Sequence, residues 1–242
     1  MNANVIAIDG PAYVGKSVIA KALSEITGRA YINTGHMYRA VARVAMEREI
    51  AHTDARSLVA ALQDLRIQFL PQKKEWRTVV DGQDWTDALD DPKVVLFSSK
   101  IAMIPQLREI LTELQRGYAK ERTVIMEGRD IGSVVFPDAL WKFFITASLD
   151  VRARRMHKVL KEEEKRRHAD FRALIPKVQE IDDADRSRKV SPLIEAPDAI
   201  VYDNSDSPSA LQDALVLQYY VSHHQEIVQN GERLGAKIGK HS

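Results

Sequence analysis

The stretch from Gly10 to Ser17 reads GPAYVGKS and fits the pattern G-x-x-x-x-G-K-S, which is typical of a loop that binds phosphate groups. Its glycines let the backbone turn so that several N–H groups point at one anion, and the helix that follows adds the positive end of its dipole. Lys16 brings a positive charge to the phosphates, and the hydroxyl of Ser17 is a ligand for Mg²⁺. The predicted phosphate site therefore consists of Gly10, Pro11, Ala12, Tyr13, Val14, Gly15, Lys16 and Ser17.

The residues on both sides of this loop support the same interpretation. Val5 to Ile8 form a short, wholly apolar run, which is typical of a strand buried on both faces of a parallel sheet. After Lys16, apolar residues recur at helical spacing as far as Ile26, and Gly28 ends the pattern. A strand, a glycine-bearing loop and a helix follow one another, as a phosphate-binding loop requires.

The rest of the chain alternates between apolar runs and helical patterns. Further strands are expected over 30–32, 123–126, 141–145 and 199–202, and helices over 36–47, 105–119, 151–168 and from Ser207-Pro208 onward. This alternation predicts an α/β fold whose central parallel sheet has five strands and is flanked by helices. The helix expected over 151–168 carries eight lysines and arginines against three glutamates, which marks it as a basic arm.

One segment departs from this alternation. Between about 53 and 100 the sequence shows a helical pattern and two strand-like runs, at 66–70 and 77–80, separated by turn signals. We therefore predict a core domain formed by 1–52 and 103–230, an inserted α+β domain over 53–102 and a flexible tail over 231–242. Within the core domain, we expect a helical lid over about 151–190.

Composition excludes several classes of protein. The 242 residues carry a formal charge of +1, which argues against a general binder of nucleic acids or membrane surfaces. Cysteine is absent, so disulfides, thiolate metal sites and thiol nucleophiles are excluded. No run approaches the roughly 20 apolar residues of a membrane span, and the N-terminus lacks the basic region of a secretory signal. We therefore expect a cytoplasmic protein.

Motif strings narrow the class of phosphate-binding protein. A GTPase would carry N-K-x-D and D-x-x-G, and a transporter ATPase would carry an L-S-G-G-Q-like signature, but none of these strings occurs in the sequence. Small kinases that use ATP with Mg²⁺ remain, and they need a second site for an anionic acceptor. Arg39, Arg108, Arg129 and Arg188 are the candidates for that site, and Arg129 follows a predicted strand, where open α/β sheets place ligands.

Six segments carry a resemblance to a known family. They are Ile6–Pro11 (IAIDGP), Asn33–Arg39 (NTGHMYR), Asp81–Thr86 (DGQDWT), Pro105–Glu109 (PQLRE), Gly128–Ala139 (GRDIGSVVFPDA) and Asp182–Leu193 (DDADRSRKVSPL). Over roughly residues 4–215 the chain resembles the bacterial cytidylate kinases. The resemblance implies a P-loop NTPase fold, a monophosphate-binding insertion, and Mg²⁺-dependent transfer of the γ-phosphoryl group of ATP to CMP or dCMP. It also places the chain in pyrimidine nucleotide metabolism, and we expect a monomer.

The resemblance also implies roles for particular residues. Arg39 and Arg129 would hold the acceptor phosphate, and Asp185 and Arg188 would lie at the ribose and phosphate end near the lid. Ser99, Arg108 and Asp130 would read the cytosine, with Thr34 beside the substrate. Since cytosine offers an N4 amino donor, a carboxylate acceptor suits it, whereas the O4 of uracil would leave that carboxylate unpaired. The implied catalytic set is Lys16, Arg129, Asp185 and Arg188.

Several positions depart from the family. Tyr13 and Val14 stand where the loop usually carries small residues, Val18 replaces a common Thr, and Ile181 and Asp90 each stand where the family has an arginine. Tyr13 in particular is expected to need a left-handed or strained backbone. These departures leave two alternatives open. One is a kinase for a different monophosphate or small metabolite, and the other is a catalytically weak nucleotide-binding regulator.

Overall fold

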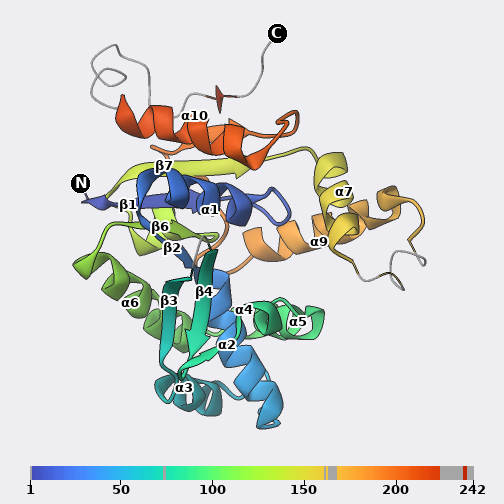
Figure 1. Cartoon of the computed structure of the whole chain (residues 1–242). Helices are drawn as coiled ribbons and strands as arrows, with labels where there is room; N and C mark the ends of the chain where they lie inside the picture. Colours follow the sequence, from blue (N-terminus) through green and yellow to red (C-terminus); the bar gives the residue numbers. More distant parts are fainter. Residues whose placement is uncertain (1, 73–74, 161, 163–167, 224–236, 239–242) are drawn as a thin grey trace.

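The computed structural model describes residues 2–72, 75–160, 162, 168–223 and 237–238 (Figure 1). Its central sheet is parallel and contains the five strands expected from the sequence: β1 (Asn2–Asp9), β2 (Ala30–Asn33), β6 (Val124–Glu127), β7 (Ala139–Thr146) and β8 (Ile200–Asp203). Their order across the sheet is β2-β6-β1-β7-β8, so the strand that leads into the phosphate-binding loop lies in the middle. A sixth strand that the sequence does not predict, β9 (Lys237–Ile238), pairs with β8 at the edge.

The central strand is buried on both faces because its apolar residues alternate between two cores. Val5 and Ala7 belong to one apolar cluster, and Ile6 and Ile8 belong to the cluster on the opposite face. Helices α1 (Lys16–Thr27) and α10 (Ala210–Ser222) contribute side chains to the cluster around Ile6 and Ile8. Helices α2 (Thr34–Glu47) and α6 (Pro105–Glu121) contribute to the other. The predicted α/β architecture is confirmed.

Residues 53–102, for which the sequence predicts an inserted α+β element, lie below the central sheet in Figure 1. This element contains α3 (Ala55–Gln63), β3 (Ile67–Gln72), β4 (Glu75–Val80), β5 (Gln83–Asp84), α4 (Thr86–Leu89) and α5 (Pro92–Ile101). The three strands are antiparallel, with Ile67 opposite Val80. The buried side chains of this element belong to the same cluster as those of α2 and α6, so it packs directly on the core.

A helical arm projects at the right of Figure 1. It consists of α7 (Leu149–Val159), the 3-10 turn η2 (Phe171–Leu174) and α9 (Ile175–Arg186). Ala153, Met156, Leu174 and Val178 form an apolar cluster inside it, and the side chain of Tyr13 packs against that cluster. Tyr13 is therefore one point at which the arm meets the phosphate-binding loop.

Two helix boundaries differ from the prediction. Helix α7 ends at Val159, within the basic helix expected over 151–168, because the backbone of Leu160 is extended and its side chain packs against the apolar cluster of the arm. Residues 161 and 163–167 of the predicted helix lie outside the described residues. The closing helix begins at Ala210, where the side chain of Ser209 caps it by accepting a hydrogen bond from the Gln212 N–H. No helix in the described ranges is long and apolar enough to cross a membrane.

Candidate functional site

The loop between β1 and α1 has the backbone that its glycines permit. Gly10 has φ of 145°, and a Cβ atom at this position would lie 2.1 Å from the carbonyl oxygen of Ile145 in β7. Gly15 has φ of 92° and immediately precedes the first turn of α1. Tyr13 has φ of 61°, the left-handed conformation predicted for this position, which is strained in a residue other than glycine. The loop therefore keeps a fixed curvature around the N-terminus of α1.

Lys16 lies buried within the curve of this loop. Its Nζ donates a hydrogen bond to the carbonyl oxygen of Pro11 at 2.7 Å, and the residue is 6% exposed. Burial, followed by the positive charge of Arg129, lowers the pKa of the Lys16 ammonium to about 7. A bound phosphate group would supply the missing negative charge and favour the protonated form.

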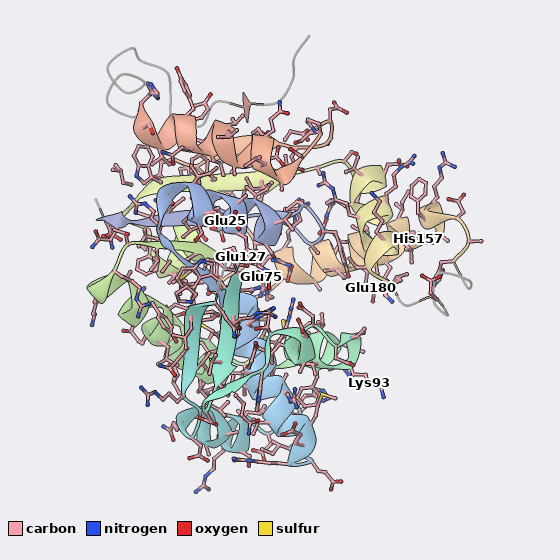
Figure 2. All side chains as sticks on the ribbon, viewed as in Figure 1. Glu25, Glu75, Lys93, Glu127, His157 and Glu180 are labelled. Carbon is pink, nitrogen blue, oxygen red and sulfur yellow. The ribbon has the colours of Figure 1, made fainter. Side chains whose placement is uncertain are left out.

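Two acidic residues that were not among the predicted site residues lie beside Lys16. Asp9 ends β1 and accepts hydrogen bonds from the N–H groups of Ile131 (2.9 Å) and Gly132 (2.7 Å). Burial nevertheless raises the pKa of Asp9 to about 7. Glu127 ends the neighbouring strand β6, level with Ile8, and Figure 2 labels it in the middle of the molecule. Each of these acidic residues ends a buried strand, and this pattern in the sequence could have identified Asp9 and Glu127 as site residues.

Glu127 and the predicted metal ligand Ser17 converge on one hydroxyl group. The phenol of Tyr31 donates a hydrogen bond to Glu127 Oε1, and Ser17 lies close enough to act on the pKa of the same phenol. A serine hydroxyl and a carboxylate are oxygen ligands of the kind that Mg²⁺ takes alongside nucleotide phosphates. These side chains therefore fit a magnesium ion, with the Ser17 hydroxyl as a ligand and the Glu127 carboxylate nearby.

Three predicted residues meet where the arm faces the sheet. Arg129, just after β6, donates from Nε to Asp185 Oδ2 on α9 at 2.7 Å. Arg188 lies 3.1 Å from the other carboxylate oxygen of Asp185 and is also buried. Burial opposes ionisation of Asp185, but the charges of Arg129 and Arg188 outweigh it and hold the pKa of this carboxyl below its usual value. Two guanidinium groups are thus fixed on one carboxylate next to Lys16.

A second pair of predicted residues lies deeper, on α6 and after β6. Arg108 and Asp130 form a buried ion pair, and Arg108 also donates to the carbonyl of Ala102 at 3.1 Å. The ring of Tyr38 lies under this guanidinium, with 5.5 Å between the Arg108 Cζ and the ring centroid. Among the described residues, nothing accepts a hydrogen bond from the buried Nε of Arg108. One buried donor of the pair is therefore left without an acceptor.

The remaining predicted residues are more scattered. Thr34 donates to the backbone carbonyl of Glu127 at 2.7 Å, which places it at the end of β6. Arg39, on α2, is paired with the carboxylate of Asp90 from the inserted element. Ser99 lies on an exposed part of α5, where its hydroxyl donates to the carbonyl of Leu96 at 2.8 Å. No interaction described for Ser99 joins it to Arg108 or Asp130.

Arginines of the basic arm hold the loop from the outside. Arg155 donates to the carbonyl of Val14 at 2.9 Å and to the side chain of Asn204 at 3.0 Å. Asn204 in turn donates to the same Val14 carbonyl at 2.8 Å. Arg152 is buried against Asp182 and reaches the carbonyl of Ala12 at 3.4 Å. These contacts were not predicted individually, because they depend on how α7 and the residue after β8 pack against the loop.

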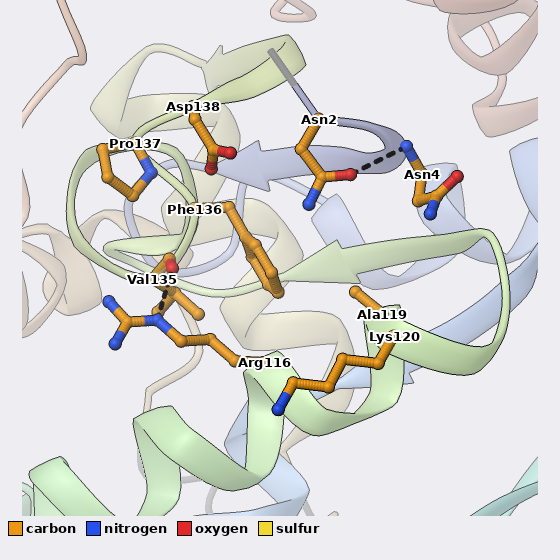
Figure 3. A pocket seen from close by; sticks show the side chains of 9 residues that line it. All are labelled: Asn2, Asn4, Arg116, Ala119, Lys120, Val135, Phe136, Pro137 and Asp138. Atoms are coloured by element: carbon orange, nitrogen blue, oxygen red, sulfur yellow. Dashed lines mark hydrogen bonds between the residues drawn. The ribbon is translucent and has the colours of Figure 1, made fainter.

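A hollow of about 540 Å³ lies at the opposite end of the sheet (Figure 3). Its lining includes Asn2 at the start of β1 and Arg116, whose guanidinium donates to the carbonyls of Val134 and Val135. None of the predicted site residues lines it. Since ligands of open parallel sheets bind at the carboxyl ends of the strands, the candidate site is the one around Lys16.

Comparison with known proteins gives a consistent result. A family model described as Cytidylate kinase matches residues 6–221. The chain is 42% identical over 201 residues to a protein of Clostridium botulinum (strain Hall) named cytidylate kinase, an alignment that covers 83% of this chain and 90% of the relative. A cytidylate kinase of Caldanaerobacter subterraneus is 39% identical over 83% of this chain and 87% of its own length. A cytidylate kinase of Caldicellulosiruptor saccharolyticus is 37% identical, in an alignment that covers 89% of this chain and 96% of the relative.

Proposed function

The chain belongs to the cytidylate kinase family, and we propose that it transfers the γ-phosphoryl group of ATP to CMP or dCMP, giving ADP and CDP or dCDP. The observation that carries the proposal furthest, beside the family match, is the meeting of Lys16, Arg129, Asp185 and Arg188 at the phosphate-binding loop. The family match and the intact loop favour an enzyme of this kind over a different acceptor or a nucleotide-binding regulator.

The chemistry asks for charge neutralisation and positioning. An oxygen of the acceptor phosphate attacks the γ-phosphorus, the bond to the bridging oxygen breaks, and ADP leaves. A phosphate monoester has its second pKa near 6, so the attacking oxygen is already unprotonated at neutral pH and needs no general base. We assign Asp185 the task of fixing Arg129 and Arg188, which face the negative charge of the reacting phosphates.

The loop supports the donor nucleotide. The backbone N–H groups of residues 10–17 and the N-terminus of α1 would bind its phosphates, and Lys16 would stabilise the charge that moves during transfer. Mg²⁺, held by Ser17 with Glu127 nearby, would supply further neutralisation of the phosphate oxygens. We assign the arm over about 151–190 the role of a lid that excludes water, the competing acceptor.

The buried Arg108–Asp130 pair supports recognition of cytosine. Asp130 can accept a hydrogen bond from the N4 amino group, and the free Nε of Arg108 can donate to a ring acceptor. Uracil offers an acceptor where cytosine offers the amino donor, so a buried carboxylate rejects it. The inserted domain 53–102 would close the acceptor side, with Arg39 on the phosphate. A monomeric, cytoplasmic enzyme is part of the proposal.

The test is a panel of nucleoside monophosphates incubated with ATP and Mg²⁺ and analysed for diphosphates. Faster formation of CDP and dCDP than of any other diphosphate supports the proposal. Another preferred product indicates a kinase with a different acceptor. ATP binding in calorimetry without any transfer indicates a regulator. Light scattering on the purified protein checks the monomer.

A further inference from the structure

The carboxylate of Asp90 lies among basic side chains between the core and the inserted element. Asp90 follows α4 and forms an ion pair with Nη1 of Arg39 on α2. Its Oδ1 also lies 3.5 Å from Nε2 of His36, one turn earlier on the same helix. Burial opposes the charge of Asp90, but His36, Arg39 and Lys21 outweigh it and keep the pKa of this carboxyl below its usual value.

The neighbours of Asp90 are held in place by the inserted sheet. His36 is buried, and its Nδ1 shares a hydrogen bond of 2.7 Å with the hydroxyl of Thr78 in β4. The Thr78 N–H donates to the hydroxyl of Thr86 in α4, close to Asp90 along the chain. Only Asp90 is largely exposed, at 63% of its side chain, against 24% for Arg39 and 7% for His36. Asp90 can therefore leave the cluster more easily than its partners.

Arg39 is the residue to which the proposed function gives the acceptor phosphate. A carboxylate and a phosphate monoester both present oxygens to a guanidinium group in the same forked manner. The two anions therefore compete for Arg39, and a dianionic phosphate placed there would also be repelled by a neighbouring Asp90. An arginine at position 90, as the resemblance implies for the family, would attract the phosphate instead.

We propose that Asp90 acts as an internal competitor for the acceptor phosphate, pairing with Arg39 until the phosphate displaces it, and so sets the affinity for the monophosphate. This inference rests on the proposed function. The ion pair connects the end of α4 to α2, so when the phosphate displaces Asp90, the inserted element also loses one polar contact with the core. Asp90 is a positioning residue that acts on the acceptor phosphate through Arg39.

The test compares steady-state kinetics of Asp90→Asn with the natural protein. The KM for CMP is expected to fall about three- to tenfold, which is the scale of one partly exposed ion pair, while the KM for ATP stays unchanged. Asp64→Asn is the matched control, because Asp64 also pairs with an arginine, Arg48, but on an exposed surface. The control should leave both KM values unchanged.

Two further measurements separate competition from a merely structural effect. Calorimetry should show tighter binding of CMP to the Asp90→Asn variant but equal binding of cytidine, which has no phosphate. In an Arg39→Ala background, Asp90→Asn should no longer lower the KM for CMP. An unchanged or raised KM for CMP in the single variant would overturn the inference, because Asp90 would then be neutral or would support Arg39. If the natural protein phosphorylates another monophosphate, the proposed function fails, and the same comparison is made with that acceptor.

Discussion

Arg155 of α7 donates a hydrogen bond to the backbone carbonyl of Val14 at 2.9 Å, which fastens the basic arm to the phosphate-binding loop. We predict that Arg155→Ala raises the KM for ATP about three- to tenfold, because the Val14 carbonyl loses one hydrogen bond, and Asn204, which donates to the same carbonyl, loses its contacts with Arg155. The KM for CMP should change little. Arg154→Ala is the control, since Arg154 pairs with Asp150 and stacks over Phe171 away from the loop. Equal changes in both variants would contradict this role.

Replacement of the loop lysine is expected to remove catalysis but not the fold. Lys16→Ala should lower kcat by at least about 10²-fold, since the charge on the transferred phosphoryl group loses its nearest cation. The far-ultraviolet circular dichroism should stay that of the natural protein. Turnover close to the natural rate in a folded variant would remove Lys16 from the site.

ATP binding should be linked to protonation of Lys16. With its pKa lowered to about 7, this lysine is mostly neutral at pH 8 in the free protein, and bound phosphates raise the pKa again. Binding at pH 8 is therefore expected to take up nearly one proton. Calorimetry in buffers of different ionisation enthalpy measures this number, and it should fall towards zero in Lys16→Ala. Proton release on ATP binding at pH 8 would contradict the prediction that bound phosphates raise the pKa of Lys16.

Asp130→Asn is expected to weaken the preference for cytosine. The amide keeps an acceptor but adds a donor that can serve the O4 of uracil, so the ratio of kcat/KM for CMP over UMP should fall at least about tenfold. Asp138→Asn, in the hollow at the far end of the sheet, should leave this ratio unaltered. The same ratio in all three proteins would exclude Asp130 from base recognition.

Gly10→Ala should disrupt the loop, because its Cβ would meet the Ile145 carbonyl oxygen at 2.1 Å. We expect loss of ATP binding and a fall in the free energy of unfolding of about 3 kcal/mol or more. Gly28→Ala tests the backbone effect alone: φ there is 69°, but no atom lies within 4 Å of the added carbon. That control should cost about 1 kcal/mol in urea denaturation and keep ATP binding.

Local patterns predicted the framework of the molecule. The apolar run of β1, the glycines of the loop and the spacing of α1 each depend on residues close in sequence, and all three elements are present. The partners of the site residues could not be predicted in this way. Asp9 and Glu127 meet Lys16 because β1 and β6 are neighbours in the sheet, and the pairing of Arg39 with Asp90 depends on how α4 packs.

Short elements and helix ends were missed for a related reason. β5 and β9 have two residues each, too few for a hydrophobic period to appear. The end of α7 at Val159 has no stop residue such as glycine or proline, and it is set by Leu160, which has an extended backbone and packs on the apolar cluster of the arm. Tertiary contact decides such positions, so a single sequence carries little information about them.

The apolar cluster formed by Ala153, Met156, Leu174 and Val178 gives α7, η2 and α9 a small interior of their own. A segment with its own interior can swing as a rigid body, since its motion breaks polar contacts at the base without unpacking the sheet. Tyr13 of the phosphate-binding loop packs on the same cluster, so its ring lies at the contact between the loop and the arm. The arm thus contacts three successive loop residues, Tyr13 through this ring and Ala12 and Val14 through arginines of α7, so a displacement of the arm would reach the loop at all three.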